Sequence, residues 1–529
     1  MEFHKLLRYS LISGSIAILA ACSSADSSNP TPTNPTNPTG TLVTISGSVF
    51  ASDVGGATVN IKQTDGTVVA GPVTTNSDGS YSVDILDTDL ASDLVVESTG
   101  GGFVDEETGA NTTAGTMLAF VDGGTLADGD SVHVTPDSTI YAELRTTHGK
   151  TTAAAQTSFF SAFAHNPDFS VDPIAVDDPT AMTASDASIH AGWLAAVFSR
   201  LTANLGLTPE QQFDLFAALA QDLSNGDLDG SDASGAVAIG TTGSNLPADI
   251  LDQYIATAGS FDTATAANMT VTYTPPMMNV HGKNVFKLMI EDNLGGVTGL
   301  TDLQVMPMMY MADRTHSTPM GAITELGGGE YEVTAYYLMP SRMMDGTTMG
   351  TWELKVMTNM KTFHFYPNID MAMMSNTARV QLKGVDDMIV NMDGLPIPRN
   401  YNIFRDNLEK PGAGDNHNFD VFIAPMENMM SFPALVDGDT LTSGMGGTPY
   451  LVNGVTVEAS DDDGITWNTG VPTGTDGVWN FSGSEALTLP SGENQVRVRL
   501  TVSSEVKTTN GLTADPGVND FATFTITVP

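Results

Sequence analysis

The sequence has a single cysteine and few basic residues. Cys22 is the one thiol in 529 residues, which excludes an intramolecular disulfide and a zinc site built from cysteines. Lysine and arginine total 20, against 62 aspartates and glutamates, so the formal net charge is −42. Such a chain lacks the basic surface of a sequence-independent nucleic-acid-binding protein, and we expect no nucleic-acid partner.

Long apolar runs are also scarce. Beyond the first 21 residues no segment is long and apolar enough to be predicted to cross a membrane. The chain is too long for one hydrophobic core, since single cores stop growing at about 250–300 residues. Its 52 glycines and 27 prolines, with 41% hydrophobic residues, favour many turns and a β-rich fold.

The N-terminus carries a targeting signal. Lys5 and Arg8 precede a short apolar run that ends in the sequence LAAC at Cys22. This segment resembles the lipobox of bacterial lipoproteins. The resemblance implies a signal peptide over residues 1–21, lipidation of Cys22, and a lipid-anchored, extracytoplasmic protein at the outer membrane or cell surface. Residues 22–41 are rich in Ser, Pro, Thr and Asn and are predicted to form an extended tether.

Residues 42–122 alternate apolar and polar residues between Asp-Gly turn signals, which predicts strands. A pattern of small, apolar and turn residues runs through this segment, on Gly47, Val49, Ala57, Val59, Thr75, Gly79 and Tyr81. This pattern resembles the carboxypeptidase regulatory-like, prealbumin-type β-sandwich, a family that implies a structural spacer and no peptidase activity.

Residues 123–268 change character and predict an acidic helical module. Apolar residues recur at helical spacing over 151–163 and 188–205. Thr208, followed by a proline, is the predicted N-cap of a further helix that ends before Gly226.

Methionine is concentrated in the second half, because 24 of the 27 methionines lie between Met269 and Met445. This half again predicts short strands, as a sandwich over 269–360 and an Ig-like β region over 361–529 that forms one domain or two. The predicted fold class is therefore mainly β: tandem antiparallel β-sandwiches, Ig-like and prealbumin-like, with an inserted small helical module.

Several methionines cluster with histidines. A thioether is a soft, neutral ligand that suits Cu(I), and it remains available where thiols would oxidise. Alternate residues of a strand share a face, so Met306 and Met308 would point one way, and Met309 and Met311 the other. Pro307 cannot donate to a strand ladder, which predicts an edge strand or a loop there. A loop would let Met308, Met311, His316 and Met320 converge.

Residues 280–360 contain three motifs in order: the M-P-x-M segment at 306–309 with His316, the G-x-Y strand at Tyr331 and the G-x-W strand at Trp352. With these motifs the segment resembles the YtkA-like/FixH-like β-sandwich family. It implies a small extracytoplasmic domain linked to copper. The chain departs from the family pattern by inserting residues 341–349, which adds methionine.

These observations predict a surface-anchored lipoprotein that binds copper as Cu(I), for capture, tolerance or delivery to a protein partner. The primary set of predicted ligands is Met306, Met308, Met309, Met311, His316, Met320 and Met339. The secondary set is Met277, Met278, His281, Met343, Met344, His364, Met371, Met373 and Met374.

An alternative stays open, because methionine also fills irregular cores and covers promiscuous contact surfaces. The chain would then be a structural or adhesive cell-surface β-sandwich protein without a metal. The sequence contains neither a G-x-S-x-G nor an H-E-x-x-H motif, and we expect no enzymatic activity.

Overall fold

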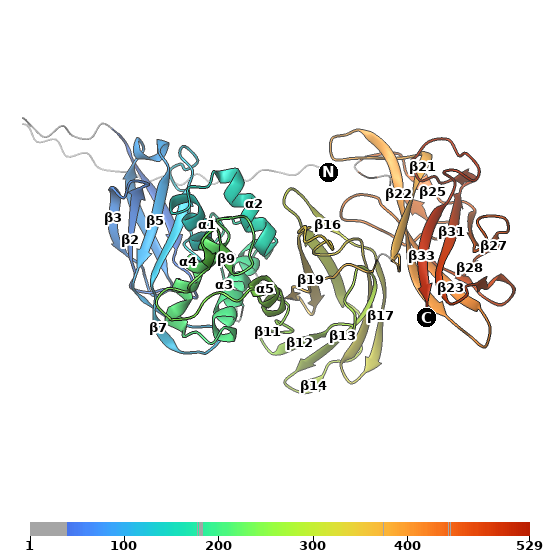
Figure 1. Cartoon of the computed structure of the whole chain (residues 1–529), viewed down its shortest axis with the longest axis horizontal. Helices are drawn as coiled ribbons and strands as arrows, with labels where there is room; N and C mark the ends of the chain where they lie inside the picture. Colours follow the sequence, from blue (N-terminus) through green and yellow to red (C-terminus); the bar gives the residue numbers. More distant parts are fainter. Residues whose placement is uncertain are drawn as a thin grey trace, which may run out of the picture.

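The chain folds into three bodies that follow one another along its long axis, with the first sandwich at one end and the third at the other (Figure 1). The computed structural model describes residues 40–176, 178, 184–373, 375–442, 444, 446–474 and 476–529. The named strand pairs within those ranges are antiparallel. The predicted fold class, mainly β with tandem antiparallel sandwiches and inserted helices, is confirmed.

The first sandwich packs a β1–β4 pair against a four-stranded sheet of order β3-β2-β5-β8. Burial alternates along β4, where Tyr81, Val83 and Ile85 point inward, as expected of a strand with one face on the core. The strands of this body are β1 Leu42–Ser48, β2 Thr58–Gln63, β3 Val68–Thr74, β4 Ser80–Leu86, β5 Leu94–Thr99, β6 Gly102–Val104, β7 Asn111–Thr113 and β8 Thr116–Val121.

Among the described residues, five α-helices follow this sandwich. Each of the first three begins at a side-chain N-cap, from Thr135, Thr151 and Ser185, because these hydroxyls accept an otherwise unpaired backbone N–H. The helices are α1 Pro136–Thr146, α2 Thr152–Phe163, α3 Asp186–Asn204, α4 Gln212–Asp222 and α5 Ile250–Ala258, and the short pair β9 Ser231–Asp232 and β10 Gly235–Ala236 lies between α4 and α5.

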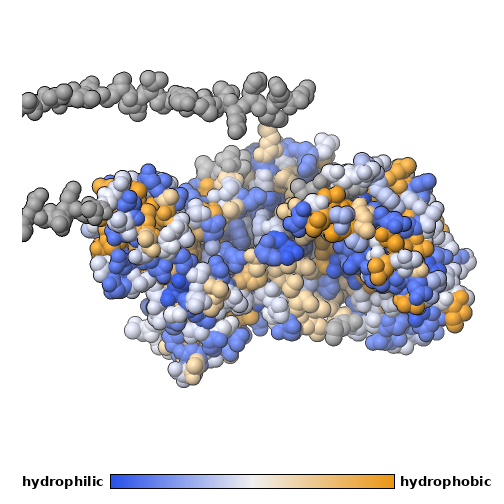
Figure 2. All heavy atoms as spheres, turned by 90° about the horizontal axis from the view of Figure 1, so that it is seen from above, coloured by the Kyte–Doolittle hydropathy of each residue, from blue (hydrophilic) through white to orange (hydrophobic). Residues whose placement is uncertain are grey.

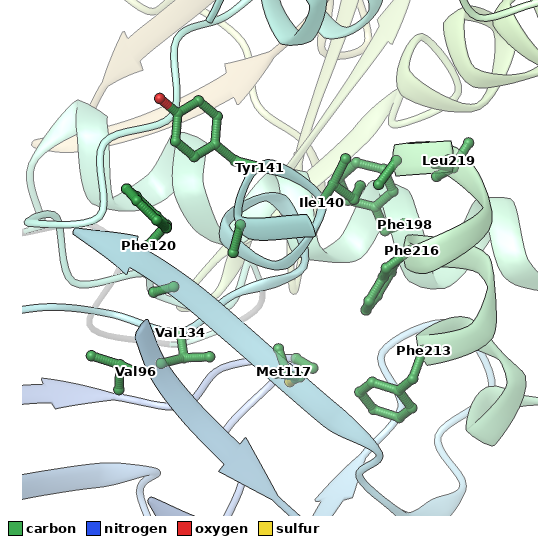
Figure 3. Close-up of a cluster of buried hydrophobic side chains, with 14 of the residues drawn as sticks. Val96, Met117, Phe120, Val134, Ile140, Tyr141, Phe198, Phe213, Phe216 and Leu219 are labelled. Carbon is green, nitrogen blue, oxygen red and sulfur yellow. The ribbon is translucent and has the colours of Figure 1, made fainter. Parts of the chain in front are cut away.

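The helices and the first sandwich share one core. Helix α1 lies against β8, and its Ile140 and Tyr141 belong to the same buried cluster as Val96 and Met117 of the sandwich (Figure 3). Phenylalanines of α3 and α4 belong to the same cluster. The predicted boundary between residues 122 and 123 therefore crosses one continuous core.

The second sandwich packs a sheet of order β11-β12-β13-β18-β17 against one of order β16-β15-β19-β20. Trp352, fully buried, lies in the core between them. Its strands are β11 Thr263–Ala266, β12 Met269–Thr274, β13 Gly282–Asp292, β14 Gly295–Gly296, β15 Gln304–Tyr310, β16 Thr315–Ser317, β17 Met320–Gly327, β18 Glu330–Tyr337, β19 Thr351–Thr358 and β20 Lys361–Phe365. Strands β11 and β20 thus extend this body beyond the predicted 269–360 at both ends.

The third sandwich has a single main core that runs from Leu382 to Val528, so the region left open as one domain or two shares one core. Its sheets have the orders β21-β22-β23-β29-β28 and β27-β26-β31-β32, and β30 and β33 are added on β23 and β31. The strands are β21 Arg379–Val390, β22 Pro396–Glu409, β23 Asn416–Pro425, β24 Thr440–Leu441, β25 Tyr450–Leu451, β26 Val455–Ser460, β27 Asn468–Thr469, β28 Val471–Pro472, β29 Val478–Phe481, β30 Leu487–Thr488, β31 Gly492–Val502, β32 Glu505–Val506 and β33 Ala522–Val528.

Gly47 in β1 lies close to the segment that leads into α1. A Cβ atom at this position would stand 1.8 Å from the carbonyl oxygen of Val132, which also accepts a hydrogen bond of 2.6 Å from the Tyr81 hydroxyl.

We predict that Gly47→Ala lowers the unfolding free energy of this body by about 1–3 kcal/mol, the usual cost of overpacking. Thermal denaturation measures the loss. Gly412→Ala is the control, because a Cβ there meets nothing within 4 Å, and equal midpoints for both variants would contradict the prediction.

Candidate functional site

Strand β15 divides the primary set between its two faces. Met309 is fully buried in the core of the second sandwich, whereas Met306 is 37% exposed on the opposite face. Met308 shares the face of Met306, because alternate residues of a strand point the same way. The segment is a strand, and β16 pairs with it only from Met308 to Tyr310. Pro307 thus lies outside the β15–β16 ladder, so the backbone N–H that proline lacks is not needed there.

His316 is the one histidine of the primary set, and it is buried beside Met309. The two residues are direct cross-strand partners, which places their side chains on one face. The imidazole Nδ1 lies 2.7 Å from the carbonyl oxygen of Ser317, so Nδ1 carries the proton and donates it. Nε2 then carries the lone pair, and this atom is buried without a hydrogen-bond partner. Burial lowers the pKa of His316, which keeps the ring neutral.

Three more methionines of the primary set pack against the same core. Met311, Met320 and Met339 are partly buried at its edge, and the indole of Trp352 donates a hydrogen bond of 3.1 Å to the carbonyl of Met339. Met308 needs correction: it was predicted to converge with Met311, His316 and Met320, but it lies on the other face of β15.

Two groups of the secondary set, far apart in sequence, lie side by side. A bridge between Val280 and Asp370 brings His281 next to Ala372, whose backbone N–H donates a hydrogen bond of 2.9 Å to His281 Nδ1. The proton of a neutral His281 is therefore on Nε2, so neither nitrogen offers a free lone pair while this bond is kept. Met371 is partly buried here, and the neighbouring Met277, Met278 and Met373 are 103%, 75% and 72% exposed.

The inserted segment 341–349 carries two more residues of the secondary set. Met343 and Met344 are 37% and 66% exposed on its turn. At these exposed positions neither Met343 nor Met344 joins the group around His316. His364, also of the secondary set, lies on β20, where its Nδ1 is 2.7 Å from Oε1 of Glu353.

Glu353 is a buried carboxylate on the face of the second sandwich that meets the helices. The hydroxyls of Tyr310 and Tyr366 donate hydrogen bonds of 2.7 and 3.3 Å to it, in addition to the contact with His364. Burial opposes ionisation of Glu353, but the hydrogen bond and the charge of His364 outweigh it and lower the pKa. His364 also lines a cavity of about 370 Å³ together with Trp193 of α3.

His190 of α3 fills the space between the helices and this sheet. Its ring stacks on Trp193, Tyr310 and Tyr366, with centroids 5.3–5.9 Å apart, and its Nε2 is buried without a hydrogen-bond partner. Burial lowers the pKa of His190 to about 4, and the neighbouring His165 acts in the same direction. The junction is therefore built around a histidine that is neutral at pH 7.

Two predicted site residues, Cys22 and Met374, lie outside the described residues. Within the described part of the chain, no three side chains of His, Cys, Asp or Glu are grouped so that they could hold a metal ion. This statement does not cover methionine, which is not among those four residue types. Within the same residues, no helix is both long enough and apolar enough to cross a membrane.

No family model and no curated protein matches the chain. Among solved structures, the adhesin InvE of Yersinia pseudotuberculosis aligns at 13% identity over 49% of this chain and 60% of its own, with a TM-score of 0.15. Domains 4–9 of the surface layer protein SbsC align at 13% identity over 56% of this chain and 41% of theirs, also at 0.15. A conserved domain protein from Bacillus anthracis aligns at 11% identity over 50% and 88%, at 0.20. The chain thus spans less than two thirds of the first two structures, and at such TM-scores none of the three bears on function.

Sequence reasoning identified His364 at this junction but missed Glu353, Tyr310, Tyr366 and His190. Glu353 stands between Trp352 and Leu354 in its strand, and a carboxylate at such a position is a signal, since buried carboxylates need partners. Its partners come from β15, β20 and the segment just after it, and His190 comes from a helix, so no local pattern in the sequence connects them.

We predict that acid weakens the fold through His190. Because the folded-state pKa lies below the ordinary value of 6.5, the unfolded chain binds a proton between pH 6.5 and about 4 and the folded chain does not. Stability is therefore lost as pH falls through that window, by about 3 kcal/mol for a shift of this size. Thermal midpoints at pH 7 and pH 4.5 test this, and His190→Phe, which keeps an aromatic ring, should lose less than the parent. Equal losses would argue against His190.

Proposed function

We propose that the chain is a structural β-sandwich protein of the cell surface. It keeps its three bodies in a fixed arrangement and projects them from a lipid anchor at Cys22. The observation that carries this proposal is that both junctions between the bodies are made of partly buried, directional contacts. Domains joined by a flexible linker would share few such contacts. No enzymatic reaction is part of the proposal.

The first junction joins helix α2 to the second sandwich. Arg342, from the inserted segment, donates hydrogen bonds of 2.8 and 2.5 Å to the carbonyl oxygens of Ser161 and Ala162, in the last turn of α2. Thr351 donates one of 3.0 Å to the carbonyl oxygen of Ala164. A cation at the C-terminal end of a helix also interacts favourably with the helix dipole. The insertion that departs from the family pattern therefore supplies a junction contact.

The second junction joins the second and third sandwiches through aromatic rings. Tyr336 of β18 stacks on Phe422 of β23, with centroids 3.9 Å apart and the planes inclined by 14°. The Tyr336 hydroxyl donates a hydrogen bond of 2.5 Å to Asp406, which also forms an ion pair of 2.9 Å with Lys283. These side chains are a small core of their own between the two bodies.

Exposed methionines give such a protein a contact surface. On the face shown in Figure 2, hydrophobic residues lie among hydrophilic ones instead of forming one continuous apolar area. The flexible, polarisable thioether adapts to varied partners, which suits scattered contacts. The strongly exposed methionines are Met277, Met278, Met344, Met360, Met373 and Met392.

We predict that Arg342→Ala loosens the first junction. The variant removes both bonds to α2 and should enlarge the radius of gyration and the maximum dimension seen by small-angle X-ray scattering, while circular dichroism stays unchanged. Arg314→Ala is the matched control, since Arg314 is exposed and pairs with its own neighbour Asp313. Identical scattering from the parent and both variants would show that Arg342 does not maintain the arrangement.

A second candidate function is binding of Cu(I) by the primary set, and the His316 side chain favours it. Histidines that bind a metal usually donate their other N–H to a carbonyl or carboxylate, which fixes the tautomer. His316 has this arrangement, with Nδ1–H donated to Ser317 and Nε2 buried beside Met309. Met309, Met311, His316, Met320 and Met339 fit the group by soft-donor chemistry. Capture or delivery to a partner protein would follow from such a site.

We predict that a combined Met309→Leu, Met311→Leu and His316→Gln variant loses at least about tenfold in Cu(I) affinity, an effect of about 1.4 kcal/mol. Leucine keeps the volume of methionine, which limits the cost to folding. Competition against a chromophoric Cu(I) chelator measures the loss. Met277→Leu with Met278→Leu, at exposed positions, is the control. If the parent fails to compete, copper binding is removed from the proposal and the structural function remains.

A further inference from the structure

The third sandwich encloses a cluster of charged side chains from several parts of its sequence. Arg399 of β22 and Lys507, which follows β32, are both 0% exposed. Asp387 of β21 is 2% exposed and Glu427 is 1% exposed, and Glu505 of β32 is partly buried. Burying so many charges is expensive unless each one is paired. Packing alone therefore does not explain why these charged side chains are buried together.

The side-chain amine of Lys507 lies close to two carboxyl groups. Its Nζ lies 2.8 Å from Oε1 of Glu505 and 3.5 Å from Oδ2 of Asp387. The rings of Tyr401 and Tyr450 lie beside the same nitrogen, with centroids 4.9 and 5.3 Å away. An amine and a carboxyl group are thus held at near-contact distance in a buried site.

Asp387 receives hydrogen bonds that would polarise its carboxyl group. Nε of Arg399 is 3.1 Å from both carboxylate oxygens, and the Tyr401 hydroxyl donates a bond of 2.5 Å to Oδ2. Fixed donors of this kind stabilise negative charge that develops on oxygen when a carbonyl carbon is attacked. Arg399 also pairs with Glu427, so the guanidinium stays in place from two sides.

Glu505 is fixed on the other side of Lys507. Its carboxylate accepts the backbone N–H groups of Val385, Asp386 and Asp387, at 2.8, 3.1 and 3.1 Å. It therefore connects the chain around Asp387 with the amine of Lys507 and is placed to accept a proton from it.

We propose that Lys507 and Asp387 join in an amide bond between Nζ and Cγ, a covalent cross-link inside the third sandwich. The Lys507 ammonium gives a proton to Glu505, and the neutral amine attacks Cγ of Asp387. Arg399 and Tyr401 stabilise the negative charge on the carboxyl oxygen. One carboxyl oxygen then leaves with two protons that originate from the ammonium, one of them delivered by Glu505. An ammonium and a carboxylate become an amide and one water, so atoms and charge balance and no co-reactant is needed.

The cross-link would join β21, the first strand of the third sandwich, to the segment that directly follows β32, near the C-terminal end of that sandwich. These two segments already share a bridge between Lys383 and Thr508, with backbone hydrogen bonds of 2.6 and 2.9 Å. A bond here closes a long loop, and it restricts the unfolded chain as a disulfide does in chains with more cysteine.

Tryptic digestion of the denatured full-length chain, followed by mass spectrometry, tests the proposal directly. An amide on Lys507 blocks cleavage there, so the expected product joins residues 384–399 to residues 500–529 and lacks one water. Free peptides of full mass, with cleavage after Lys507, would overturn the proposal and leave a cluster of ion pairs only. Because the parent chain alone gives this answer, the test does not depend on any variant folding.

Four variants then examine the chemistry. Lys507→Arg keeps the positive charge and should remove the cross-linked peptide, whereas Lys62→Arg, in the first sandwich, should leave it unchanged. Asp387→Asn should give the same product as the parent, with loss of ammonia in place of water. Glu505→Gln should lower the cross-linked fraction severalfold in chain that remains folded by circular dichroism. A cross-link that survives Lys507→Arg would refute the assignment to Lys507.

Discussion

The guanidinium of Arg342 joins the end of helix α2 to the second sandwich. It joins a body with a mixed helical and β core to a pure sandwich, and its acceptors are backbone carbonyls that a helix end leaves unpaired. The rings of His190, Trp193 and Tyr366 stack on one another at the same junction. The polar bonds of Arg342 are partly buried, and they are stronger there than at an open surface.

Much of the fold could be predicted from the sequence, because alternation and capping are local signals. Strand β18 begins and ends where the alternation does, and α2, Thr152–Phe163, nearly coincides with the helical spacing predicted over 151–163. Helix α1 was missed because its first turn is polar, yet Asp137 and Ser138 are buried against the sandwich. Strand β22 was missed because Pro396 and Pro398 discourage a strand prediction, although both lie at its start, where it pairs with β21.

The candidate sites were less predictable than the fold. Composition alone identified the methionine-rich half, and the period of two separated Met306 from Met309 correctly. The tautomers of His316 and His281 could not be predicted, since they follow from the carbonyl of Ser317 and the N–H of Ala372. The charged cluster around Lys507 gave no signal at all, because its members come from four separate segments and each resembles an ordinary surface charge.

The two junctions differ in chemistry, and this difference has a thermal consequence. The contact between the second and third sandwiches has stacked rings at its centre, Tyr336 on Phe422 with Phe404 beside them, in addition to the hydrogen bond from Tyr336 to Asp406. Hydrophobic association weakens on cooling, whereas hydrogen bonds to helix carbonyls depend far less on that effect. In a cold environment the third sandwich would gain freedom first, while the helices and the second sandwich still moved as one unit. The chain would then have a temperature-dependent joint between its second and third sandwiches.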